Sequence, residues 1–192
     1  LAAHGTASGT ARIYLNSFEP TENYLAKAAA NAISHYSLRG LQVPTPDIRI
    51  VDVLPGPYAS GQGSVLTTDA DDLKRFGIPK GVYFTPRAVT PIFADYTVAH
   101  ELVHFTLGER EPDRFSNFFE EGVAEFVSIF DYTRDRFGAE AARNTMLIHR
   151  LTSAVGLQWD HYIDGARACL SAVLANGLNK LYSTIERGRT AL

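Results

Sequence analysis

The segment His100-Glu101-Leu102-Val103-His104 is the most informative motif in the helical second half of this chain. It lies in a helical pattern that Pro91 can open and that Gly108 can end. Successive residues of an α-helix are about 100° apart around its axis. His100 and His104 are therefore expected one turn apart on one face, with both imidazoles pointing in the same direction.

The opposite face of this expected helix is apolar. Val98, Leu102 and Phe105 cluster there at helical spacing. Such a stripe predicts that the helix packs against a hydrophobic core through these three side chains. The two histidines would then point away from that core, toward whatever lies on the other side of the helix.

The residue types on the histidine face are those of a catalytic zinc site. Neutral imidazole nitrogens are good ligands for Zn²⁺, and a catalytic zinc keeps one position open for water. Glu101 is expected beside the two histidines, where its carboxylate can take a proton from that water. The motif therefore predicts zinc as the cofactor, His100 and His104 as ligands and Glu101 as a general base.

A third ligand is expected from an acidic helix downstream. Residues 118–126 read Phe-Phe-Glu-Glu-Gly-Val-Ala-Glu-Phe, and no histidine follows at a suitable spacing before His149. Glu121 and Glu125 are four residues apart and share a helix face, so one can bind the metal while the other hydrogen-bonds a ligand imidazole. Glu120 is either a solvated surface charge or a rival ligand.

Together the two motifs resemble the gluzincin metallopeptidases, most closely the branch of aminopeptidase N and the leukotriene hydrolases. The resemblance implies that Glu121 is the third zinc ligand and that Glu125 supports the site from behind a ligand. The segment Tyr162-Ile-Asp-Gly-Ala166 is similar to one in the same branch, where the tyrosine stabilises the oxyanion of the tetrahedral intermediate. By that resemblance Tyr162 is a catalytic residue, with His161 as the alternative donor.

The resemblance covers residues 95–182, a little under half of the chain, and it has three departures. The 16 residues between His104 and Glu121 make a slightly short gap, and Glu120 stands where an asparagine is common. The Gly-x-Met-Glu-Asn segment that holds a substrate amino terminus is absent. Aminopeptidase specificity is therefore not expected, and a more general zinc hydrolase is.

The first half of the chain has a mixed pattern, and the second half is almost entirely helix-forming. Strands are expected at residues 12–18, 47–53 and 81–85, and helices at 21–39 and 69–77, where Asp69 is a candidate cap. Gly81, Val82 and Tyr83 are a candidate edge strand for an extended peptide. The layout predicts an α+β fold, a reduced thermolysin-like domain spanning 1–192, with a mixed part over 12–90 and a helical part over 91–187.

Composition narrows the range of functions. The net charge is −3 without a basic run, which disfavours a nucleic-acid surface or a polybasic membrane anchor. The single cysteine excludes an intrachain disulfide and a cysteine-based zinc ribbon. With no long apolar stretch or signal-peptide pattern, a soluble protein is expected. The sequence therefore predicts a zinc metallopeptidase acting on a peptide or protein. The alternatives are a zinc-binding regulatory module without turnover and a zinc hydrolase acting on a non-peptide amide or ester.

Overall fold

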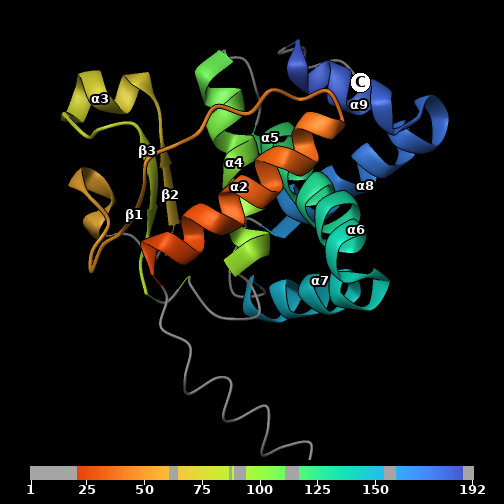
Figure 1. Ribbon diagram of the computed structural model, residues 1–192, viewed down its shortest axis with the longest axis horizontal. Helices are drawn as coiled ribbons and strands as arrows, with labels where there is room; N and C mark the ends of the chain where they lie inside the picture. Colours follow the sequence, from red (N-terminus) through yellow and green to blue (C-terminus); the bar gives the residue numbers. More distant parts are fainter. Residues whose placement is uncertain are drawn as a thin grey trace, which may run out of the picture.

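The computed structural model describes residues 21–60, 65–86, 88, 94–110, 117–153 and 159–187. Three short strands form one mixed sheet in the N-terminal half, and the rest is mostly helical (Figure 1). The predicted α+β class is confirmed. The strand expected at residues 12–18 lies outside the described residues.

Helix α2 (Glu22–Leu38) begins directly after Thr21, which caps its first turn. The side chain of Thr21 accepts a hydrogen bond from the backbone nitrogen of Tyr24 at 3.2 Å, which satisfies one free amide of the first turn. One face of α2 is buried, and its five buried residues are Leu25, Ala28, Ala29, Ala32 and Tyr36. The small alanines on that face let α2 pack closely across the helical half of the molecule (Figure 1).

The sheet has the order β1-β3-β2. Strand β1 (Ile48–Ile50) pairs in parallel with β3 (Gly81–Phe84), and β2 (Val65–Thr68) pairs with β3 in antiparallel register. The prediction that Gly81, Val82 and Tyr83 form an edge strand is therefore wrong, because β3 is the central strand. All four residues of β3 are buried, as a strand covered on both faces requires. Strand β2, which lies at an edge of the sheet, was not predicted from the sequence.

Along the chain, a 3-10 helix η1 (Gly56–Ser60) lies between β1 and β2, and a short helix α3 (Ala70–Phe76) lies between β2 and β3. The predicted cap of α3 is confirmed: Asp69 accepts from the backbone of Asp71 and Asp72, and Asp72 bonds back to the backbone of Asp69. Gly77 ends α3 in the left-handed conformation, with φ 68°, which glycine adopts at little cost.

The helical half begins with α4 (Ala94–Arg110), which contains both histidines. The end predicted at Gly108 is wrong, because α4 continues to Arg110; a glycine inside a helix costs only about 1 kcal/mol. The elements that follow are α5 (Asn117–Glu125), the π-helix η2 (Phe126–Thr133), α6 (Arg134–Phe137), α7 (Ala139–Ser153), α8 (Trp159–Asn176) and α9 (Leu178–Glu186). Gly138 separates α6 from α7, and Gly177 separates α8 from α9.

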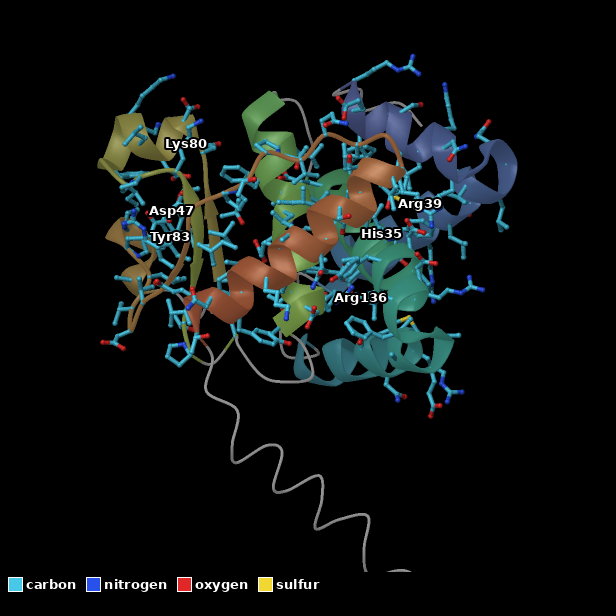
Figure 2. The ribbon with its side chains drawn as sticks, in the orientation of Figure 1. His35, Arg39, Asp47, Lys80, Tyr83 and Arg136 are labelled. Atoms are coloured by element: carbon cyan, nitrogen blue, oxygen red, sulfur yellow. The ribbon has the colours of Figure 1, made fainter. Side chains whose placement is uncertain are left out.

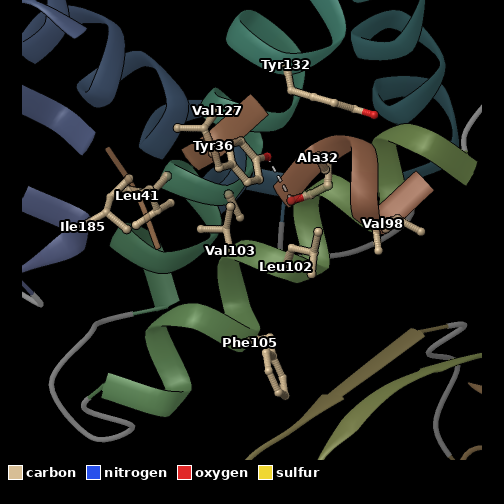
Figure 3. Packing of buried hydrophobic residues seen from close by; sticks show 14 of the residues in the cluster. Ala32, Tyr36, Leu41, Val98, Leu102, Val103, Phe105, Val127, Tyr132 and Ile185 are labelled. Carbon is tan, nitrogen blue, oxygen red and sulfur yellow. Dashed lines mark hydrogen bonds between the residues drawn. The ribbon is translucent and has the colours of Figure 1, made fainter. Parts of the chain in front are cut away.

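The main core lies where α4 packs between α2, the sheet and the later helices (Figure 3). The predicted apolar stripe of α4 is confirmed, since Val98, Leu102 and Phe105 are all buried. Tyr36 of α2 also reaches into this core, where its hydroxyl donates to the backbone oxygen of Ala99 at 3.0 Å. Among the described helices, none combines the length and the hydropathy that crossing a membrane requires.

The π-helix η2 contains a buried aspartate that joins three elements. Asp131 Oδ2 accepts from the hydroxyl of Tyr182 on α9 at 2.6 Å and lies 2.9 Å from Nε2 of His35 on α2. Asp131 Oδ1 accepts from Arg39 at 2.8 Å (Figure 2 labels His35 and Arg39). Burial alone would raise the pKa of Asp131, but these partners lower it. Because η2 continues directly from α5, this cluster also anchors α5, the helix that contains Glu121 and Glu125.

Replacing Asp131 by Asn is expected to lower the free energy of unfolding by on the order of 3 kcal/mol at pH 7. The change removes the carboxylate that Arg39 pairs with, and it leaves His35 only the exposed carboxylate of Asp135, 3.4 Å from its Nδ1. The folded pKa of Asp131 lies below its unfolded value of about 3.9, so this stabilisation is complete above that pH and is lost as pH falls through the folded pKa. Urea unfolding at pH 7 and near pH 3 measures both effects. The exposed pair of Asp164 with Arg167 supplies the control, because Asp164→Asn should cost less than about 1 kcal/mol; equal losses for the two variants would contradict the buried anchor.

Candidate metal centre

The two histidines of α4 face each other as the helical spacing predicted. Their ring centroids are 4.8 Å apart, and Nε2 of His100 lies 3.0 Å from Nε2 of His104. Both residues are well covered by the surrounding protein, with side-chain exposures of 7% and 14%. Two imidazole nitrogens are thus held at close range in a place where water alone cannot easily solvate them.

Glu121 of α5 completes a triangle with these nitrogens. Its Oε2 lies 3.4 Å from Nε2 of His100 and 3.3 Å from Nε2 of His104. This oxygen is buried and has no hydrogen-bond partner within the described part of the chain. A buried carboxylate oxygen without a donor is costly, unless a cation occupies the space that it shares with the two nitrogens.

The dimensions of the triangle fit one small metal ion. Zinc bonds to nitrogen and carboxylate oxygen at about 2.0–2.2 Å in tetrahedral sites, which places neighbouring ligand atoms about 3.3 Å apart. The three measured separations are 3.0, 3.3 and 3.4 Å. His100, His104 and Glu121 therefore form a group that could hold a metal ion, with a fourth position left for another ligand.

Each histidine also has a carboxylate at its other ring nitrogen. Nδ1 of His100 lies 3.3 Å from Oε2 of Glu125, which is buried and accepts a hydrogen bond from the Tyr96 hydroxyl at 2.6 Å. Nδ1 of His104 lies 3.0 Å from Oε1 of Glu120. The hydrogen bond to Glu120 orients the imidazole of His104 so that its other nitrogen points at a metal. Nδ1 of His100 is close to Glu125 but has no hydrogen-bond partner within the described part of the chain. Glu125 lies where the resemblance implied, whereas Glu120 faces Nδ1 of His104 and not the Nε2 pair.

The carboxylates give the centre a strongly negative electrostatic character. Burial alone would lower the pKa of His100, but Glu121 and Glu125 raise it to about 9. Burial opposes the charged form of His104 as well, and Glu120 and Glu121 still raise its pKa well above the ordinary value. The two imidazoles in turn lower the pKa of Glu121, although its burial acts in the opposite direction. The centre therefore attracts a cation, and protons and metal ions compete for the same nitrogens.

A cavity of about 350 Å³ opens beside the triad. Its walls are the edge strand β2, the histidine face of α4, the start of α5 and Tyr162 of α8. Glu101 lies in this wall, and its Oε2 accepts a hydrogen bond of 2.6 Å from the hydroxyl of Thr67 on β2. Thr67 was not predicted as a site residue, because β2 is a four-residue strand whose sequence has no alternating pattern.

Tyr162 of α8 lies beside His100 in the wall of this cavity. Its ring stacks on that of His100, with centroids 6.0 Å apart and an angle of 22° between the planes. Burial raises the pKa of Tyr162, and the nearby carboxylates of Glu121, Glu101 and Glu125 raise it further. Its hydroxyl therefore keeps its proton at neutral pH and can donate it in a hydrogen bond. The side chain of His161, the alternative donor, lies outside the described residues.

Two glycines bring Glu121 and Tyr162 to the same cavity. Helices α5 and α8 cross at Gly122 and Gly165, and a Cβ built on Gly122 would lie 2.4 Å from the backbone of Gly165. Real Cβ atoms do not approach a backbone so closely. Gly122, the residue after Glu121, therefore permits the close approach of α5 to α8.

Replacing Gly122 by Ala is expected to destabilise the protein by about 1–3 kcal/mol, because the methyl group pushes α8 away from α5. Helix propensity alone predicts the opposite, a gain of about 0.5–1 kcal/mol. The sign of the change in unfolding free energy therefore tests the crossing. Ala168→Gly on the exposed face of α8 calibrates the propensity term, and a Gly122→Ala protein more stable than the parent would contradict the close approach.

Comparisons with known proteins do not assign a family to this chain. No family model matches it, and no match was found among curated proteins or solved structures. The resemblance to the gluzincins therefore rests on the sequence motifs quoted above. The metal centre rests on the geometry of His100, His104 and Glu121.

Proposed function

We propose that this protein is a zinc-dependent hydrolase, a small gluzincin-type metallopeptidase. The observation that supports the proposal best is the convergence of His100 Nε2, His104 Nε2 and Glu121 Oε2 at the wall of a cavity that also contains Glu101. Two imidazoles and one carboxylate are a donor set that suits Zn²⁺ with an open coordination position. When bound there, zinc would polarise a substrate carbonyl and make a water molecule more acidic.

Glu101 is the proposed general base. It borders the cavity next to both histidines, and the Thr67 hydroxyl occupies one of its two carboxylate oxygens. The other oxygen is available to accept a proton from water. Glu101 would then pass this proton to the leaving amine, so that the same carboxylate serves both halves of the reaction.

Tyr162 is the proposed donor to the oxyanion. Its raised pKa keeps the phenol protonated, and a preorganised donor stabilises the negative charge that develops on the carbonyl oxygen. Glu101 and Tyr162 lie on different elements, α4 and α8. Base and donor can therefore approach a carbonyl from different directions in the cavity.

Tyr162→Phe is expected to lower kcat by about 10²-fold, because removing one oxyanion donor costs about 10²–10³ in rate. Zinc content and the unfolding midpoint should stay close to those of the parent, since the ring is retained. Steady-state kinetics on a peptide that the parent protein cleaves, together with metal analysis, test this. An unchanged kcat would show that Tyr162 is not the oxyanion donor, and His161 would then be the candidate for that role.

An extended peptide is the proposed substrate. Strand β2 lies at the edge of the sheet and lines the cavity, so it offers backbone groups to a strand added alongside. The peptide-binding edge strand is therefore proposed to be β2, in place of Gly81, Val82 and Tyr83. A peptide paired with β2 would pass directly in front of Glu101, which β2 contacts through Thr67.

A proteome-derived peptide library incubated with zinc-loaded protein tests the proposal. Cleavage at a preferred residue, lost on chelation and restored by zinc, is the expected result. Bound zinc with no cleavage of any peptide would contradict a peptidase. Ester and amide substrates outside the peptide class would then distinguish a non-peptide hydrolase from a regulatory zinc module.

A further inference from the structure

The base and the edge strand are joined by one hydrogen bond. Thr67 Oγ1 donates to Glu101 Oε2 at 2.6 Å, across 34 residues of sequence and from the sheet to α4. In the described part of the chain, no second hydrogen bond to the Glu101 carboxylate is found. A bond to an ionised oxygen at this distance belongs to the strong, charge-assisted class.

The neighbouring threonine of β2, Thr68, shows that the contact with Glu101 is specific to position 67. The hydroxyl of Thr68 donates to the backbone oxygens of Pro79 at 2.9 Å and Gly81 at 3.1 Å, within the sheet region. Alternate residues of a strand point to opposite faces. The register of β2 against β3, with Thr67 opposite Val82, therefore directs the Thr67 hydroxyl to the helix side.

We propose that Thr67 is a positioning residue, which fixes the orientation of the Glu101 carboxylate and joins it to the strand that binds substrate. This inference rests on the proposed hydrolase function. With Oε2 held by Thr67, Glu101 presents Oε1 to the cavity. Without that donor the carboxylate can rotate about its last torsion, whose preferences are weak.

Placement of the base is the property that Thr67 would control. A displacement of about 1 Å at a catalytic group can lower the rate by about 10²-fold. Binding of zinc should not depend on Thr67, because its hydroxyl contacts Glu101 and none of His100, His104 or Glu121. Binding of a peptide backbone along β2 should also survive, since the backbone of β2 is unchanged. The expected signature is a loss in kcat with little change in KM.

Three variants test this inference. Thr67→Val removes the hydroxyl and keeps the shape and the preference for a strand, whereas Thr67→Ser restores a donor. Thr184→Val is the matched control, because its hydroxyl donates to the backbone of Lys180 within α9, away from the cavity. We expect Thr67→Val to lower kcat by about 10–10²-fold with KM within about twofold, Thr67→Ser to recover most of it, and Thr184→Val to behave like the parent.

A readout without turnover accompanies the kinetics. Crystal structures of the metal-free parent and variants should show one orientation of the Glu101 carboxylate in the parent and in Thr67→Ser, and a displaced or divided one in Thr67→Val. Full kcat in Thr67→Val, or an unmoved carboxylate, would overturn the inference. A zinc-loaded parent that cleaves nothing would overturn the proposed hydrolase instead, while the crystal structures still decide whether Thr67 orients Glu101.

Discussion

Replacing Glu101 by Gln is expected to lower hydrolysis by about 10²–10⁴-fold, the range that general-base catalysis supplies. Glutamine keeps the size of the side chain and can still accept a hydrogen bond from Thr67. It cannot take a proton from water. Because Glu101 lies outside the triad of possible ligands, metal binding should remain.

Parallel measurements of zinc content and of kcat on zinc-loaded Glu101→Gln protein check this expectation. Glu140→Gln, on the exposed first turn of α7, is a matched control that should leave both quantities unchanged. Retained activity in Glu101→Gln would remove Glu101 as the base. Loss of zinc together with activity would show instead that Glu101 is a ligand, and would contradict the assignment of the triad.

Glu121→Ala is expected to abolish tight metal binding, whereas Glu120→Ala should weaken it only by about 10–100-fold, the usual effect of removing a group that orients a ligand. The difference follows from geometry. Oε2 of Glu121 lies within 3.4 Å of both Nε2 atoms, while Glu120 contacts Nδ1 of His104 on the other side of its ring. Removing Glu121 takes away a ligand, and removing Glu120 only loosens an imidazole.

Competition with a zinc-binding dye gives both affinities in one format. Glu125→Ala is the second comparison, and it should resemble Glu120→Ala because Glu125 approaches Nδ1 of His100. Circular dichroism of the metal-free proteins checks that each variant is folded. If Glu120→Ala lost the metal and Glu121→Ala retained it, the wrong glutamate would have been assigned.

Local patterns predicted the parts of the site that lie on single helices. The spacing of His100 and His104 placed them on one face of α4, and the apolar stripe opposite them is buried. The i, i+4 relation of Glu121 and Glu125 was likewise enough to place both on the side of α5 that faces the histidines. These features depend on helical periodicity, which can be recognised from the spacing of residue types along the sequence.

Periodic patterns in the sequence do not predict which helices and strands contact one another. Strand β2 has only four residues, so Thr67 was not expected beside Glu101. The uninterrupted apolar run of β3 is typical of a central strand, so the prediction of an edge strand there is wrong. The choice of Glu120 as a surface charge or a rival ligand depended on the crossing of α4 and α5. That crossing is set by tertiary packing.

Metal analysis of the purified protein decides whether His100, His104 and Glu121 hold a metal ion. After reconstitution with zinc and removal of the excess, we expect about one zinc ion per chain in the parent and in His35→Gln, whose imidazole lies in the Asp131 cluster. His104→Ala should hold almost none. A parent that binds no zinc, or a His104→Ala protein that binds as much as the parent, would contradict the metal centre formed by His100, His104 and Glu121.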